Sequence, residues 1–167
     1  IENLTEIQRF LQEEFIELID LIEKRILSKV YHDFNSLFEK WLSMLIDDEN
    51  FSGKLDEEFS PKIIQNGYDI NYLYLSGGEK TAVALAYRLA LNQVINNIIS
   101  HINTKDLIIL DEPTDGFSEE QLDKVKLVLN ELNIKQILIV SHESKIESFV
   151  SNIIKCEKKN NITKVIQ

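Results

Sequence analysis

The chain has 167 residues, of which 44% are hydrophobic and 28% charged, with only 5 Gly and 2 Pro. This composition fits one domain with a real core and excludes a low-complexity or disordered chain. The net charge of -10 gives no general support to nucleic-acid binding, so any DNA contact would need a local basic patch. We expect no membrane span, because no run of about 18 apolar residues occurs.

The single cysteine, Cys156, excludes an internal disulfide and fits a reducing compartment. Its flanking residues suggest a strand end, so we predict a buried structural thiol. The acidic, amphipathic start lacks the basic region of a signal peptide. Because the chain begins at Ile1, we expect it to be a piece of something longer that works in the cytoplasm, associated with the nucleoid, or in a nucleus.

Residues 1–48 are predicted to form one helical segment, the base of a coiled coil. Apolar residues recur at four-three spacing in two phases, and such spacing marks a seam that requires a second helix. The phase shift near Ile26 and Leu27 suggests a break or a change of partner. A cluster in the second phase could meet a partner protein or pack on a returning helix. The first phase comprises Leu11, Phe15, Leu18 and Ile22; the second comprises Val30, Phe34, Leu37, Trp41 and Met44; the cluster comprises Phe34, Leu37, Phe38 and Trp41.

Residues 49–167 are predicted to form a second unit, an α/β lobe that begins with a β-hairpin. Asn66-Gly67 favours the tight turn with positive φ that joins antiparallel strands. After it, strands and helices alternate, which is the order of a parallel sheet with flanking helices. The expected strands are 51–59, 62–65, 68–75, 107–110, 136–140, 153–156 and 162–166, and the expected helices are 76–99, 118–132 and 143–149.

The sharpest motif is Leu75-Ser76-Gly77-Gly78-Glu79-Lys80, at the start of a predicted helix. A helix N-terminus exposes unpaired N–H groups, its dipole favours negative charge, and glycines let an anion come close. Ser76 and Glu79 also fit a capping box, a structural interpretation that is compatible with the first. We predict that Ser76, Gly77, Gly78 and Glu79 bind phosphate.

A second motif runs from Leu107 to Glu112. Four apolar residues predict a strand buried on both faces, and ligands of α/β proteins bind at the carboxyl ends of such strands. Asp111 is predicted to hold Mg²⁺ through water, and Glu112 to polarise an attacking water. The plain alternative is a helix start, which the following Pro113-Thr114-Asp115-Gly116 disfavours.

His142 follows the predicted strand 136–140. At a strand end its ring could hydrogen-bond a γ-phosphate, although a lone histidine is often a surface or capping residue. His32 and His101 have no comparable setting, and we assign them no role.

These three motifs, in this order, resemble the ABC ATPases over roughly residues 70–156. The resemblance implies that Ser76, Gly77 and Gly78 bind the γ-phosphate of ATP held by an opposite subunit. It further implies that Asp111 assists Mg²⁺, Glu112 is the catalytic base and His142 senses the γ-phosphate. The expected fold is therefore the C-terminal lobe of an ABC-ATPase head, preceded by a coiled-coil stub and a β-hairpin.

The chain departs from the family in two places. Asp111 and Glu112 match the family's Walker B motif. In the family, the loop after this motif usually ends in Leu-Asp and reaches across the dimer interface, but here it reads Asp115-Gly116-Phe117-Ser118. Ser118 can instead form a capping box with Gln121. No Gly-x-x-x-x-Gly-Lys-Ser/Thr loop occurs, so the phosphates lack their cradle. ATP hydrolysis is thus expected to need an N-terminal Walker A lobe.

Ser76, Gly77 and Gly78 match the signature motif of the ABC ATPases. The long heptad-like helix before this motif resembles the split heads of the SMC-like family. Within it, the DEPT sequence looks like the Rad-fifty family of DNA double-strand-break repair ATPases. That resemblance implies an ATP-dependent dimer with a second head, an Mre-eleven-type nuclease at the coiled-coil base, and double-stranded DNA. It also implies that Arg88, the basic residue of the signature helix, relays the ATP state. Lys155, Lys158, Lys159 and Lys164 form a modest basic cluster.

Three alternatives stay open at this point. The chain could be half of an ABC transporter ATPase, and its first 48 residues would then form a helical subdomain that couples to a membrane partner. It could be a cohesin-type SMC head. It could also be an interaction module, in which the first helix docks a partner and the α/β lobe is only a scaffold.

Overall fold

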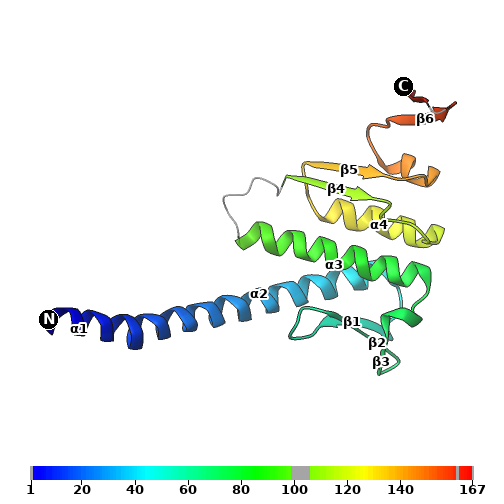
Figure 1. The fold of residues 1–167 in the computed structure, drawn as a ribbon. Coiled ribbons are helices and arrows are strands. Elements are labelled where there is room, and N and C mark those ends of the chain that lie inside the picture. Colours follow the sequence, from blue (N-terminus) through cyan, green and yellow to red (C-terminus); the bar gives the residue numbers. More distant parts are fainter. Residues whose placement is uncertain (1, 99–105, 161, 167) are drawn as a thin grey trace.

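The computed structural model of the protein describes residues 2–98, 106–160 and 162–166. A long helical stalk projects from one side of a layered body, and the C-terminal end lies at the opposite corner of the body (Figure 1). The buried apolar residues of stalk base, strands and helices form one continuous core. Of the helices that the structure describes, none combines the length and apolar character that a membrane crossing requires.

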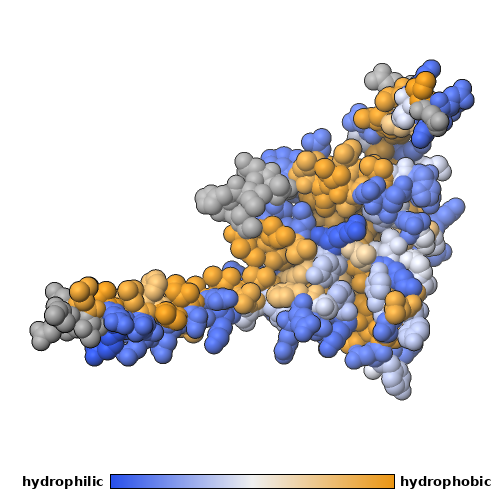
Figure 2. All heavy atoms as spheres, viewed as in Figure 1, coloured by the Kyte–Doolittle hydropathy of each residue, from blue (hydrophilic) through white to orange (hydrophobic). Residues whose placement is uncertain are grey.

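The stalk consists of α1 (Glu2–Arg9), the π-helical η1 (Phe10–Phe15) and α2 (Ile16–Leu45). The predicted helix is confirmed, but no break occurs at Ile26 and Leu27, because α2 runs through both; the irregular turn is η1. The apolar side of the stalk lies open along its length (Figure 2). Leu11, Phe15 and Leu18 are 46%, 45% and 51% exposed, so the first seam has no partner helix among the described residues.

The second seam packs inside the protein itself. Phe34, Phe38 and Trp41 are at most 2% exposed, and they pack against α3 (Gly77–Ile98) and the sheet beside it. The ring centroids of Phe34 and Tyr87 are 4.9 Å apart, and the Trp41 indole donates to Gln93 Oε1 at 3.0 Å. The suggestion that this cluster meets a partner protein was therefore wrong for these three side chains. The phase shift marks a change of partner, from an open seam to this chain's own core.

The hairpin sheet lies against the base of α2 (Figure 1). It is antiparallel and consists of β1 (Phe51–Leu55), β2 (Pro61–Gln65) and β3 (Tyr68–Ile70). Asn66 and Gly67 have φ of +53° and +81°, which confirms the predicted turn. The last strand is shorter than predicted, because the chain turns into the 3-10 helix η2 (Tyr72–Tyr74), capped by Asn71.

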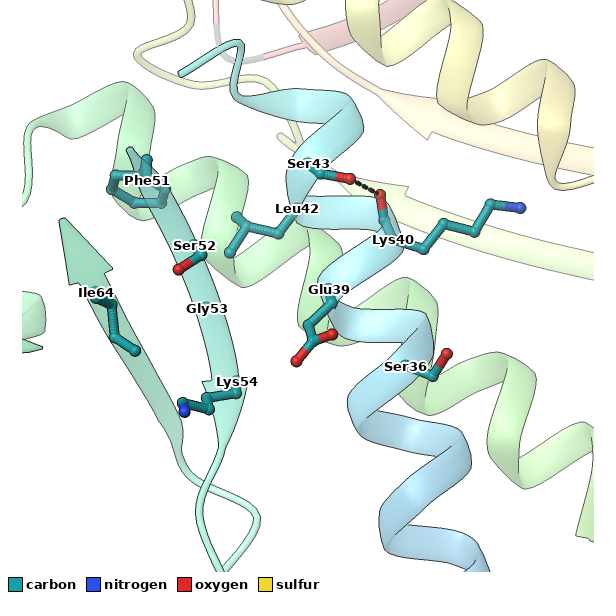
Figure 3. A pocket seen from close by; sticks show the side chains of 10 residues that line it. All are labelled: Ser36, Glu39, Lys40, Leu42, Ser43, Phe51, Ser52, Gly53, Lys54 and Ile64. Atoms are coloured by element: carbon teal, nitrogen blue, oxygen red, sulfur yellow. Dashed lines mark hydrogen bonds between the residues drawn. The ribbon is translucent and has the colours of Figure 1, made fainter. Parts of the chain in front are cut away.

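A surface cavity of about 550 Å³ is lined by α2 and the sheet beside it (Figure 3). Glu39, Lys40 and Ser43 line its helical wall, and Lys54 and Ile64 line the sheet side. None of the predicted site residues lines this cavity. The cavity is thus a feature of the junction between stalk and sheet, separate from the predicted phosphate chemistry.

α3 crosses the stalk base with a face of small residues. Ala82, Ala86 and Ala90 are fully buried and spaced four apart, so they share one face and let α2 come close. The last residue of the predicted helix, Ile99, lies outside the described residues. The next elements are β4 (Leu107–Asp111), α4 (Glu119–Glu131) and β5 (Gln136–Val140), and β4 pairs with β5 in parallel, as predicted.

The β4–β5 sheet is buried on one face only, which corrects the prediction of strands buried on both faces. Ile108 and Leu110 enter the core at 7% and 3% exposure. The other face carries Ile109, Leu138 and Val140, which are 61%, 48% and 50% exposed. The figure shows the resulting apolar patch over β4 and β5 (Figure 2). Parallel strands are normally covered on both faces, so this surface lacks a layer.

The chain ends with η3 (Ser144–Phe149), a 3-10 helix, and an antiparallel pair of β6 (Lys155–Lys159) and β7 (Ile162–Ile166). The predicted strand 153–156 therefore begins and ends later. Cys156 is exposed, so the prediction of a buried thiol was wrong. The reason is that the hairpin stands away from the core and exposes nearly all of its side chains.

Candidate functional site

The carboxyl end of the β4–β5 sheet brings together two of the predicted site residues. Asp111 ends β4 opposite Val140, and the Glu112 N–H donates to the Val140 carbonyl at 2.9 Å. This ladder directs the Glu112 side chain toward the second residue after β5, His142, and Oε2 of Glu112 lies 2.9 Å from Nδ1 of His142. Residues 30 positions apart in the sequence thus form a direct pair.

Glu112 adopts an unusual backbone conformation, with φ of +44°. The left-handed region is costly for a residue with a side chain, by roughly 1–3 kcal/mol, and such strain often accompanies functional sites. The strain is held by the ladder bond to Val140 and by the loop that follows. The carboxylate is therefore held at the sheet edge rather than in an ordinary helix start.

The Glu112–His142 pair shifts the titration of the imidazole. The pKa of His142 is raised above 6.5, first because its ring hydrogen-bonds Glu112 and then because of that residue's charge. Glu143 and Asp115 raise the pKa further through their charges. With the ring protonated, Nδ1–H donates to Glu112, so the pair is a charge-assisted hydrogen bond at the surface.

Asp111 is exposed at the end of β4 and can supply an oxygen ligand to Mg²⁺. Among residues 2–98, 106–160 and 162–166, no cluster of three or more His, Cys, Asp or Glu side chains could hold a metal ion. Mg²⁺ keeps several waters and takes one or two carboxylates together with substrate phosphates. A single exposed carboxylate such as that of Asp111 fits this mode of Mg²⁺ binding.

The signature turn begins α3 with a capping box. The Ser76 N–H donates to the Glu79 carboxylate at 2.7 Å, and the Glu79 N–H donates to Ser76 Oγ at 3.3 Å. The Ser76 hydroxyl acts as an acceptor in this box, and a side chain added at Gly77 would meet nothing within 4 Å. The turn is thus open to an anion at Gly77, while Glu79 acts as its cap.

The loop after Glu112 returns to this same turn. Thr81 Oγ1 donates to the carbonyl of Asp115 at 2.7 Å, and a Cβ atom on Gly116 would lie 3.5 Å from the carbonyl carbon of Gly77. Ser118 caps α4: its hydroxyl accepts from the Gln121 N–H at 3.3 Å, which confirms the predicted capping box. Sequence patterns did not reveal Thr81, because its partner lies 34 residues away.

The remaining predicted residues lie apart from this edge. Arg88 is exposed on α3. The basic cluster lies on the β6–β7 hairpin, where Lys155 pairs with Glu147 at 2.9 Å and Lys159 with Glu157 at 2.8 Å. These ion pairs reduce the positive charge that the hairpin presents. His101 lies outside the described residues.

The fold is that of an SMC-type ATPase head with a coiled-coil stub. The Smc head domain with a coiled coil and joint from Pyrococcus yayanosii superposes with a TM-score of 0.73 at 17% identity, covering 96% of this chain and 31% of that one. The Pyrococcus furiosus Smc head with an extended coiled coil, bound to the C-terminal domain of ScpA, gives a TM-score of 0.68 at 19% identity, covering 99% and 42%.

The chain belongs to the family of the Rad50 ATPases of DNA double-strand-break repair. The Methanococcus maripaludis protein is 30% identical over 159 residues, which are 95% of this chain and 13% of the relative. The Thermococcus kodakarensis protein is 28% identical over 152 residues, 87% of this chain and 16% of the relative. The chain thus spans less than a fifth of either relative. No protein-family model matches it. The expected Rad-fifty resemblance is confirmed.

Proposed function

We propose that this chain is the signature-bearing half of an ATP-hydrolysing head that acts in DNA double-strand-break repair, as the names of its relatives state of them. The observation that supports this most is the Glu112–His142 pair at the end of the parallel sheet. The two side chains follow different strands and meet at the carboxyl end of the sheet, where α/β proteins bind ligands. The open turn at Gly77 adds an anion-binding surface.

Each residue then has a defined task. Glu112 accepts a proton from the attacking water, and His142 hydrogen-bonds the γ-phosphate. The Ser76 hydroxyl and the amides at Gly77 bind the phosphate of a nucleotide that a second head presents. Asp111 would help to hold Mg²⁺, which neutralises charge on the β- and γ-phosphates when bound. Arg88 would relay the ATP state, and Asp115 and Ser118 would belong to the loop that faces the second head.

The exposed face of the β4–β5 sheet supports the need for a second lobe. Ile109, Leu138 and Val140 are about half exposed or more, and a parallel sheet is stable when both faces are covered. An N-terminal lobe with the Walker A loop would cover this face and supply the missing phosphate cradle. The open seam of the stalk supports a returning coiled-coil helix in the same way. The division of the chain near residue 48 remains a proposal.

The projecting stalk also favours a head of this kind over a transporter half, because a 30-residue helix with an open seam is not a compact helical subdomain. The finer partners are proposed from the relationship alone. They are an Mre-eleven-type nuclease at the stalk base, double-stranded DNA, and a second head in an ATP-dependent dimer. A cytoplasmic, nucleoid-associated location, or a nuclear one, would follow from such partners.

The proposal is tested by combining the chain with its N-terminal lobe. Glu112→Gln should bind ATP, accumulate as a dimer and hydrolyse ATP at least about a hundredfold more slowly, because the general base is lost. Glu120→Gln, an exposed carboxylate of α4, is the matched control and should behave as the native head. Light scattering and phosphate release measure both properties. Native-rate hydrolysis by Glu112→Gln would remove the base role.

Ser76→Arg tests the contact between heads. A bulky cation at the exposed signature turn should block the approach of a second head, so ATP should no longer drive dimerisation. Binding of ATP to the N-terminal lobe should persist, since that lobe holds the nucleotide in this proposal. Unchanged dimerisation would exclude a contact through Ser76.

A further inference from the structure

The two glycines of the signature turn have different surroundings. A Cβ atom at Gly77 would meet nothing within 4 Å. A Cβ atom at Gly78 would lie 2.7 Å from Oε1 of Gln121 and 3.2 Å from the carbonyl oxygen of Gly116. The first glycine is therefore open to a ligand, whereas the second is in contact with the chain's own loop and helix.

The Gln121 side chain that occupies this place is held on both sides. Its Oε1 accepts from the Ser118 N–H at 3.0 Å, and its own backbone N–H donates to Ser118 Oγ at 3.3 Å. The amide is thus part of the cap of α4 rather than a freely moving end. A methyl group at Gly78 would displace it and break that cap.

A second contact ties the same two elements together. Thr81, one turn into α3, donates its hydroxyl to the Asp115 carbonyl at 2.7 Å. Gly116 has φ of +78° and approaches Gly77 so closely that a Cβ would lie 3.5 Å from the Gly77 carbonyl carbon. The loop that leaves Glu112 is therefore hydrogen-bonded to the first turn of α3 through Thr81 and lies beside that turn at Gly116.

We propose that Thr81 and Gln121 are positioning residues that lock the loop 115–118 to the signature turn. Gly78 is a glycine because Gln121 fills the space of a side chain, while Gly77 is the glycine that faces the ligand. The lock thus keeps the Glu112 carboxylate at a fixed position relative to the turn, and so relative to the phosphate that a second head presents to the turn. The catalytic consequence depends on the proposed ATPase function, but the lock itself does not.

The packing step is tested by a double-mutant cycle on the head assembled with its N-terminal lobe. Gly78→Ala should raise the equilibrium constant for unfolding about tenfold or more in the native background, and much less when Gln121→Ala is also present. Gly77→Ala is the matched control and should change it less than about threefold. If Gly78→Ala does not fold, recovery by Gln121→Ala supports the lock. The lock is overturned if Gly78→Ala raises the unfolding constant equally in the native and Gln121→Ala chains, or if Gln121→Ala does not restore folding.

The positioning step is tested by steady-state hydrolysis. Thr81→Val removes the donor and should lower kcat about tenfold, with KM changed less than about threefold, since a lost hydrogen bond of this kind corresponds to that factor. Thr81→Ser restores the donor and should restore kcat. Thr163→Val, on the exposed β7 strand, is the matched control. An unchanged kcat in Thr81→Val, or a loss that Thr81→Ser does not restore, would overturn the positioning role.

The two tests separate the lock from the ATPase proposal. If the native head hydrolyses no ATP, the proposed function fails, and the double-mutant cycle still decides whether Gln121 restricts Gly78. If the head hydrolyses ATP and the cycle shows no coupling, the lock fails and the ATPase proposal stands.

Discussion

Nδ1 of His142 lies 2.9 Å from Oε2 of Glu112, across the ends of the two parallel strands. The proposed base and the proposed phosphate sensor therefore contact each other directly. A carboxylate has two oxygens and an imidazole has two nitrogens, so Glu112 can accept a proton from water and His142 can meet a γ-phosphate while this hydrogen bond persists.

The pair predicts the titration of His142. Its pKa is raised above 6.5, first by the hydrogen bond to Glu112. Glu112→Gln should therefore lower the pKa of His142 toward 6.5, as followed by NMR of the ring protons. Because the folded-state pKa is raised, the pair stabilises the fold fully below 6.5, and this contribution disappears as pH rises through the raised value.

If the His142 titration were identical in native and Glu112→Gln chains, the pair would not persist in solution. The charges of Glu143 and Asp115 also raise the pKa of His142. Glu143→Gln is therefore expected to lower this pKa by less than Glu112→Gln does, since the effect of Glu143 is smaller than that of Glu112.

Thr114 is the basis of a stability prediction. It is fully buried, and among the described residues its Oγ1 is the buried side-chain atom that has no hydrogen-bond partner. An unsatisfied buried hydroxyl costs roughly 1–3 kcal/mol, so Thr114→Val should raise the free energy of unfolding by about 1 kcal/mol. Urea denaturation measures this, with exposed Thr163→Val as the control. A loss of about 1 kcal/mol or more would mean that a bound water satisfies the hydroxyl.

Phe38 tests the junction of stalk and body. Its side chain is fully buried between α2, α3 and the sheet, with its ring centroid 6.2 Å from that of Tyr87. Phe38→Ala should cost about 3–5 kcal/mol of unfolding free energy, through lost burial and a cavity. Tyr68→Ala, at a side chain 77% exposed, should cost less than about 1 kcal/mol. Comparable costs for both substitutions would show that α2 does not pack on the body in solution.

Ile109 tests the proposed second lobe. It lies on the open face of β4 and is 61% exposed, so Ile109→Asp should leave the chain folded but weaken its association with an N-terminal lobe at least about tenfold. Leu127 on α4 is equally exposed at 61%, and Leu127→Asp is the matched control. Calorimetry of the two lobes measures the affinity. Equal effects of the two substitutions would place the lobe interface elsewhere.

The sequence alone determined the elements whose signals are local. Asn66-Gly67 predicted the hairpin turn, Ser76 with Glu79 and Ser118 with Gln121 predicted two capping boxes, and the four-three spacing predicted the stalk. These succeed because a turn or a helix cap is fixed by residues within a few positions of each other. The motif order also indicated the ATPase relationship.

The tertiary structure decided which surfaces are covered. Apolar runs predicted two buried strands and a buried Cys156, yet one sheet face and the last hairpin are open, because burial depends on what packs from elsewhere. Likewise, the spacing of the second stalk seam did not reveal its partner, which in the fold is α3. The contacts of Glu112 with His142 and of Thr81 with Asp115 span 30 and 34 residues, and only the folded chain brings such groups together.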